Sequence, residues 1–223
     1  MLLRGADASV IRRLALVGTE MPSGALGSRQ LGRELESMNQ FATRVRDATT
    51  QACLEPHQVS IDIDLDGEAW HLRAGFVDLR SSRLVHWRYD KVRAGDLIDG
   101  WLHHLALCAQ PPVGVVTQTY WLSLDGAVRL RSPDQPVELL QDLLRIYRDG
   151  LSEPAHFFPK SAWACWKDGE NQSKATSTWQ VTKDRPYAEG SDAAYQLALR
   201  GLGEPLNDDF FRLAKGPISG SET

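Results

Sequence analysis

The sequence predicts an α/β chain of mixed order, in which helices, antiparallel strands and further helices follow one another. The apolar residues recur at helical spacing before residue 50, alternate with polar residues over 59–65, and return to helical spacing after residue 96. Asp-Gly pairs at 66–67 and 125–126 are strong signals for tight hairpin turns, because both residue types tolerate positive φ angles. This order differs from the regular strand–helix alternation of a doubly wound sheet. We therefore expect a mixed sheet flanked by helices.

Residues 1–50 are expected to form N-terminal helices. A short helix over 10–17 is followed by a break in the Met-Pro-Ser-Gly sequence at 21–24. A longer helix then begins near residue 28. It is predicted by a stripe of apolar side chains at helical spacing: Leu31, Leu35, Met38, Phe41, Ala42 and Val45.

Residues 58–131 are expected to form the sheet core, with a central helix over 96–109. Apolar and polar residues alternate strictly from Val59 to Leu65, as in a strand with one solvated face. The central helix has apolar residues at helical spacing and is ended by Pro111-Pro112. Further strands are expected after the first hairpin turn, at about 68–74, 75–79, 84–89, 115–124 and 127–131.

Residues 137–215 are expected to form a mainly helical extension. An apolar stripe predicts a helix over 137–151, and the polar composition of 167–178 predicts a long exposed loop. Two short helices, over 192–200 and 207–214, are each opened by a residue type that caps helices. Residues 1–223 are therefore predicted to be a single domain with a C-terminal helical extension.

The composition excludes several classes of protein. Twenty-five basic and 29 acidic residues give a formal net charge of −4, which argues against a basic surface built to coat nucleic acid. No apolar run approaches the ~18 residues of a membrane span. The three cysteines are far apart, which suits a reducing compartment and offers no metal-binding pair. We expect a cytoplasmic protein with no membrane contact and no metal site.

Residues 75–91 carry the pattern most informative about chemistry. Metal-dependent phosphodiesterases of the restriction-endonuclease type place one acid at a strand end, and a second acid and a lysine two residues apart on the next strand. The acids hold a divalent cation, and the lysine helps to position and activate the attacking water. Here Asp78 supplies the first acid, but His86 stands in the place of the second acid and Arg88 in that of the lysine.

Neither replacement suits metal-dependent hydrolysis. A neutral imidazole brings no negative charge to Mg²⁺, which prefers oxygen ligands, and Arg88 stays protonated and cannot act as a base. None of the lysines in the chain follows an Asp or Glu by two residues. The sequence therefore predicts no catalytic residue. The alternative is an active metal-dependent nuclease that uses Asp78 with an acid from elsewhere, such as Glu68 or Asp90.

A basic and aromatic segment is the candidate DNA-binding surface. Residues 70–93 hold six basic residues against two acids, interleaved with Trp and Tyr side chains that suit base stacking. The alternative is a solvated sheet face whose arginines pair with the acids of 62–68. The candidate DNA-binding residues are Arg73, Arg80, Arg83, Trp87, Arg88, Lys91 and Arg93.

Two further groups of residues can be explained either by a structural role or by a functional one. His103 and His104 are adjacent on one helix and face different directions, which is poor geometry for a two-ligand metal site. Trp163, Trp166 and Trp179 flank the expected polar loop, and they suit a subunit-docking surface or a hydrophobic core equally well.

Several long runs of the sequence resemble one family in order along nearly the whole chain. The family is the C-terminal domain of RecC, the gamma subunit of exodeoxyribonuclease V, which is the RecBCD helicase–nuclease. The resemblance is carried by 87–91, 97–107, 144–151, 154–163 and 189–201, and by the Pro-Gly lead-in at 21–27. Family members are far longer, so this chain is expected to be a fragment that begins at an introduced or internal Met1.

The resemblance implies a restriction-endonuclease-like core without nuclease chemistry. In that family the domain lacks the metal ligands of the partner nuclease and serves in DNA double-strand end binding, strand separation and subunit contact. The implied partners are a RecB-like helicase–nuclease subunit, a RecD-like helicase subunit and double-stranded DNA ends. No cofactor is implied in this domain, since Mg²⁺ and ATP are used by the partner subunits. A plain protein-interaction domain that never touches DNA remains the third hypothesis.

Overall fold

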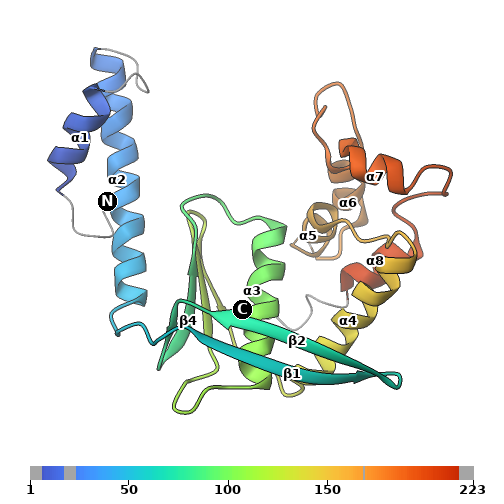
Figure 1. Ribbon diagram of the computed structural model, residues 1–223. Helices are drawn as coiled ribbons and strands as arrows, with labels where there is room; N and C mark the ends of the chain where they lie inside the picture. The colour runs from blue at the N-terminus through green and yellow to red at the C-terminus, as the bar shows by residue number, and fades with distance from the viewer. Residues whose placement is uncertain (1–6, 18–23, 168, 216–223) are drawn as a thin grey trace.

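The computed structural model describes residues 7–17, 24–167 and 169–215. The first helices are α1 (Ala8–Val17) and α2 (Ala25–Ala48), which lie side by side and project from one side of the molecule (Figure 1). The predicted apolar stripe of the longer helix is confirmed, and its C-terminal half packs through Phe41 and Val45 onto the sheet. Residues 21–23 of the Pro-Gly lead-in lie outside the described residues.

The first two strands form a long antiparallel ribbon. β1 (His57–Leu65) and β2 (Glu68–Phe76) are joined by a turn in which Asp66 and Gly67 both have positive φ angles, as the Asp-Gly pair predicts. Every second side chain of β1 from Val59 to Leu65 is buried. This face packs against α3 and α4, so the predicted alternation is confirmed.

A second sheet of four strands follows the ribbon. It consists of β3 (Leu79–Arg80), β4 (Arg83–Trp87), β5 (Thr119–Ser123) and β6 (Gly126–Leu130), in that order across the sheet. β4 and β5 are parallel and the other neighbours are antiparallel, so the sheet is mixed. The predicted strand over 75–79 is interrupted, because β2 ends at Phe76 and β3 begins only at Leu79.

Helices cover both faces of this mixed sheet. α3 (Ala94–Ala109) connects β4 to β5 and packs through Leu105 on one face, against Leu84 of β4 and Leu130 of β6. α2 covers the middle of the other face, where its apolar side chains meet Val85 and Leu122. α3 begins at a capping box between Arg93 and Asp96 and ends before Pro111-Pro112. The α/β class with a mixed sheet flanked by helices is confirmed.

The C-terminal residues are mainly helical. α4 (Pro136–Ser152) packs beside α3 and β1. The remaining helices are α5 (Pro159–Lys167), α6 (Gln172–Trp179), the 3₁₀ turn η2 (Glu189–Ser191), α7 (Ala193–Ala198) and α8 (Asp208–Lys215). These later helices gather on the side of the molecule away from α1 and α2 (Figure 1). They build a hydrophobic core of their own around Phe158, Ala162 and Phe210.

One sequence-based expectation for this part of the chain was wrong. Residues 167–178 were expected to form an exposed loop, but 172–179 form helix α6, which packs against α5. Ala175 is the one fully buried residue of α6, and Trp179 at its end packs on Phe158. A helix with so narrow an apolar face has no hydrophobic period that a sequence pattern can detect. Within the described ranges, no helix is long and apolar enough to cross a membrane.

Candidate functional site: the Asp78–Arg88 region and an apolar groove

Asp78 lies in the break between β2 and β3. Its backbone oxygen accepts hydrogen bonds from Arg80 Nη1 at 2.9 Å and from the Val85 backbone nitrogen at 3.3 Å. The bond from Val85 ties the break to β4, and the Asp78 side chain is half-buried. The structure therefore places one carboxylate at the strand end where the sequence pattern predicts it.

His86 lies on β4, and its imidazole is enclosed by aromatic rings. The ring stacks on Trp121 with centroids 5.3 Å apart, and the His103 ring also lies 5.3 Å away. Burial lowers the pKa of His86, the nearby His103 lowers it further, and the carboxylates of Asp99 and Asp78 oppose the shift. The imidazole is therefore neutral at pH 7. Its Nε2 atom is buried and finds no hydrogen-bond partner among the described residues.

Arg88 directly follows β4 and is held by two carboxylates. Its Nη1 atom lies 2.9 Å from Asp96 Oδ1, and its Nη2 atom lies 3.5 Å from Asp90 Oδ2. Asp96 is also the residue whose side chain caps the start of α3. The Arg88 guanidinium thus links the end of β4 to α3, and because it stays protonated it cannot act as a base.

The acids considered as replacements do not complete the site. Glu68 is at the far end of β2 from Phe76, which is roughly 26 Å away along an extended strand. Asp90 accepts from the Lys91 backbone nitrogen and pairs with Arg93 and Arg88, and these contacts lower the pKa of its carboxyl group. Within the described part of the chain, no group of three His, Cys, Asp or Glu side chains could hold a metal ion.

The two adjacent histidines of α3 have unrelated surroundings. His103 Nδ1 lies 2.9 Å from the backbone oxygen of Asp99, one turn earlier in the helix. His104 is fully buried between Thr119 Oγ1, at 2.9 Å from Nδ1, and the Arg131 backbone oxygen, at 2.8 Å from Nε2. His104 thus links α3 to β5 and to the residue that follows β6.

The candidate DNA-binding residues differ in how available their charges are. Arg80 is buried and donates to the backbone oxygens of Gln51 and Asp78. Arg83 lies over the Tyr120 ring, and Trp87 is 42% exposed beside Phe41. Arg88 and Arg93 pair with Asp90. Arg73 and Lys91 are exposed.

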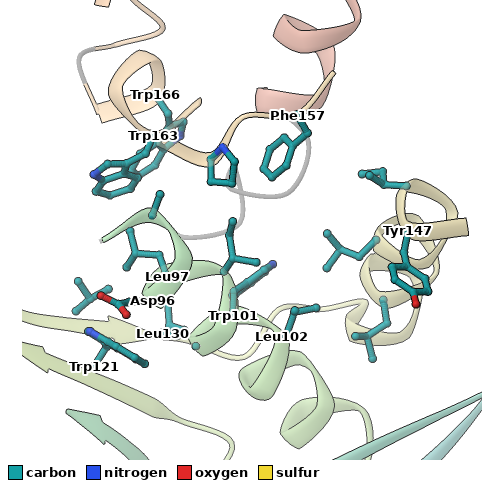
Figure 2. A pocket seen from close by; sticks show the side chains of 18 of the residues that line it. Asp96, Leu97, Trp101, Leu102, Trp121, Leu130, Tyr147, Phe157, Trp163 and Trp166 are labelled. Atoms are coloured by element: carbon teal, nitrogen blue, oxygen red, sulfur yellow. The ribbon is translucent and has the colours of Figure 1, made fainter. Parts of the chain in front are cut away.

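An apolar groove opens between α3, α4 and the start of α5 (Figure 2). Its volume is about 530 Å³. Trp101 and Leu102 of α3 and Tyr147 of α4 line it, and Trp163 and Trp166 stack on each other above it with ring centroids 5.2 Å apart. Asp96 is the one charged side chain among the lining residues, and it is already paired with Arg88. The groove can therefore hold an apolar surface and little else.

The three tryptophans near the expected loop have separate roles in the structure. Trp163 and Trp166 line the groove, whereas Trp179 packs in the C-terminal core with its ring centroid 4.1 Å from that of Phe158.

A family model described as the RecC C-terminal domain matches residues 1–170. The chain belongs to this family.

Two curated relatives carry the name "RecBCD enzyme subunit RecC". The RecC of Escherichia coli (strain K12) is 27% identical over 218 residues, which is 90% of this chain and 19% of that protein. The RecC of Mycolicibacterium smegmatis is 28% identical over 178 residues, which is 76% of this chain and 16% of that protein. The chain thus spans less than a fifth of the length of either RecC relative.

Sequence reasoning did not find the apolar groove of this RecC-family chain. Its lining comes from β2, α3, β5, β6, α4 and the segment 157–166, so it joins residues from Leu72 to Trp166 that only the fold brings together. Two signals were present: Trp163 and Trp166, which suited a docking surface or a core equally well, and the apolar stripe of the helix over 137–151, which includes Tyr147, 58% exposed. An amphipathic helix that leaves such side chains uncovered indicates a contact surface, but only the fold shows which surface faces it.

Proposed function

We propose that this chain is the C-terminal domain of a RecC subunit, and that it performs no catalysis. In this proposal it supports DNA double-strand end binding, strand separation and subunit assembly in recombinational DNA repair. One observation carries it above the others. At the positions where a nuclease of this architecture needs an acid and a lysine, the chain has the neutral His86 and the carboxylate-bound Arg88.

The proposed partners follow from the family. They are a RecB-like helicase–nuclease subunit, a RecD-like helicase subunit and double-stranded DNA ends in the cytoplasm. Mg²⁺ and ATP would be used by those subunits and not by this domain. Residues 1–223 would form a single nuclease-like domain with a helical extension, within a much longer subunit. The lengths of the curated RecC relatives support this view, because each is more than five times as long as the matched region.

The DNA contact is proposed for the exposed members of the candidate set. Arg73 and Lys91 are exposed, Trp87 is partly exposed, and Arg83 has a guanidinium stacked on an aromatic ring. Arg88 and Arg93 share Asp90, so they contribute less positive charge to the surface. Arg80 supports the strand beneath this surface through its bonds to backbone oxygens.

A pure protein-interaction domain is the second candidate function, and the apolar groove favours it. A groove of about 530 Å³ that is lined almost entirely by apolar side chains resembles the pockets that receive anchor residues at protein interfaces. Both functions can coexist in one subunit. They are distinguished by whether the chain also binds DNA.

The chain is expected to bind a blunt-ended DNA duplex, with an affinity that falls steeply as salt is raised from ~50 to ~200 mM. The physical reason is that phosphate contacts release counterions, whereas apolar contacts in a groove do not. Fluorescence anisotropy of an end-labelled duplex measures the affinity at each salt concentration. Absent binding, or binding that is insensitive to salt, would contradict the proposed DNA role and favour the protein-interaction domain.

A further inference from the structure

The outer face of the mixed sheet carries basic residues from two strands on either side of one tyrosine. Leu84, Thr119 and Leu130 are cross-strand neighbours on the face that α3 covers. Because side chains alternate along a strand, Arg83, Tyr120 and Arg129 point to the opposite face. α2 packs on that face around Val85 and Leu122. On the same face Arg129 is exposed, and Arg83 and Tyr120 are half-buried.

The side chains of this group hold one another in place. The Arg83 guanidinium carbon lies 4.5 Å from the centre of the Tyr120 ring. Arg129 donates from Nε and Nη2 to the side-chain oxygen of Gln118 at 2.8 and 2.6 Å, in the amide orientation that matches donors to acceptors. Tyr120 and Arg129 are directly opposite in the antiparallel pair of β5 and β6. We refer to Arg83, Gln118, Tyr120 and Arg129 as the arginine–tyrosine cluster.

Several arginines of the chain pair with an acid, whereas the arginines of the cluster do not. Arg88, Arg93, Arg145, Arg148 and Arg212 each pair with an aspartate. In contrast, Arg83 and Arg129 contact a hydroxyl, an aromatic ring and an amide, and neither pairs with a carboxylate among the described residues. The cross-strand neighbour of Arg83 is Arg80, which is bound only to backbone oxygens. Arg80, Arg83 and Arg129 thus bring three positive charges to this sheet, and none of them forms an ion pair with a carboxylate among the described residues.

We propose that the arginine–tyrosine cluster binds the phosphate backbone of DNA. The Nε atom of Arg83 donates to Ser82 and the Nε–Nη2 edge of Arg129 donates to Gln118. The Nη1–Nη2 edge of each guanidinium can still form two-pronged hydrogen bonds with the oxygens of a phosphate. Stacking and the bond to Gln118 also fix both side chains before binding, so little side-chain entropy is lost when the phosphate arrives. This inference rests on the proposed DNA-binding function and names a site for it. Gln118, Tyr120 and Arg129 lie outside the segment that the sequence indicated.

The test compares two double variants of the whole chain. Arg83→Gln with Arg129→Gln removes the two charges of the cluster. Arg145→Gln with Arg148→Gln is the matched control, because it removes two arginines on α4 that already pair with Asp66. Binding of a blunt-ended duplex and of a single strand is measured by fluorescence anisotropy over a series of salt concentrations. Near-ultraviolet circular dichroism, which reports on the neighbouring Trp121, checks that each variant is folded.

The cluster variant is expected to bind DNA on the order of tenfold more weakly, and its salt slope should fall by about 1–2, because two phosphate contacts are lost. The control should keep the affinity and slope of the unmodified chain. If the unmodified chain binds DNA and the cluster variant binds equally well, the cluster is not the site, although the proposed function stands. If the unmodified chain binds no DNA, both fail. If the cluster variant loses binding to a polyglutamate peptide but keeps its DNA binding, the cluster binds an acidic protein and the inference is overturned.

Discussion

Phe158→Ala is expected to lower the free energy of unfolding of the C-terminal helices by about 3–5 kcal/mol. The Phe158 side chain is 1% exposed and is the centre of an aromatic cluster. Its ring centroid lies 4.1 Å from that of Trp179, 5.2 Å from that of Tyr195 and 5.7 Å from that of Phe210. Truncation leaves a cavity that these rigid rings cannot fill, and it removes the contact that joins α6, α7 and α8.

The measurement is urea unfolding followed by tryptophan fluorescence, because Trp179 is in the cluster. Tyr187→Ala is the matched control, since Tyr187 is an aromatic residue of the same helical part but is 91% exposed. The control should change the free energy of unfolding by no more than about 0.5 kcal/mol. Equal, small effects for both variants would contradict a separate C-terminal core built around Phe158.

His104→Leu is expected to cost about 2–4 kcal/mol of stability. A carbonyl oxygen can only accept, so Nε2–H of His104 donates to the Arg131 oxygen, and in the neutral ring Nδ1 accepts from the Thr119 hydroxyl. Leucine fills the same volume but leaves both partners buried and unpaired. His86→Leu is the control, because the Nε2 atom of His86 has no partner to lose among the described residues. The His86→Leu variant should leave the stability at pH 7.5 almost unchanged.

The same histidines predict how stability depends on pH. Burial lowers the pKa of both His104 and His86 below the usual 6.5, so the unfolded chain binds more protons than the folded chain in mildly acidic solution. Their contribution to stability is complete above pH 6.5 and is lost as the pH falls below that value. His86→Leu should therefore weaken this acid destabilisation. Unfolding curves at pH 7.5 and pH 5.5 test it, and an unchanged pH dependence in the His86→Leu variant would contradict the buried, neutral imidazole.

Much of the fold was predictable because local patterns determine it. The alternation from Val59 to Leu65 and the Asp66-Gly67 turn define the first ribbon, and the apolar stripes define α2 and α3. Helix α6 was missed because only Ala175 forms a fully buried contact. The break between the second and third strands was predicted at 74–75 but lies at 77–78, since nothing in the sequence near Asp78 marks it.

The candidate site was predictable only where its residues are close in the sequence. The proposed replacement of an acid and a lysine by His86 and Arg88 rests on the spacing along β4 and the residue that follows it. The carboxylates that hold Arg88 were not predictable, because Asp96 reaches it from the first turn of α3. Likewise, Arg83 meets Tyr120 only through the parallel pairing of β4 and β5, which are joined by the whole of α3.

The central claim is a nuclease-like domain without nuclease chemistry, and a cleavage assay tests it most directly. The chain and its Asp78→Ala variant are incubated in parallel with labelled single- and double-stranded DNA, with Mg²⁺ and with Mn²⁺. We predict no cleavage above background, or a trace that is equal in both proteins. Metal-dependent cleavage that disappears in the Asp78→Ala variant would contradict this claim and show that Asp78 belongs to a working active site.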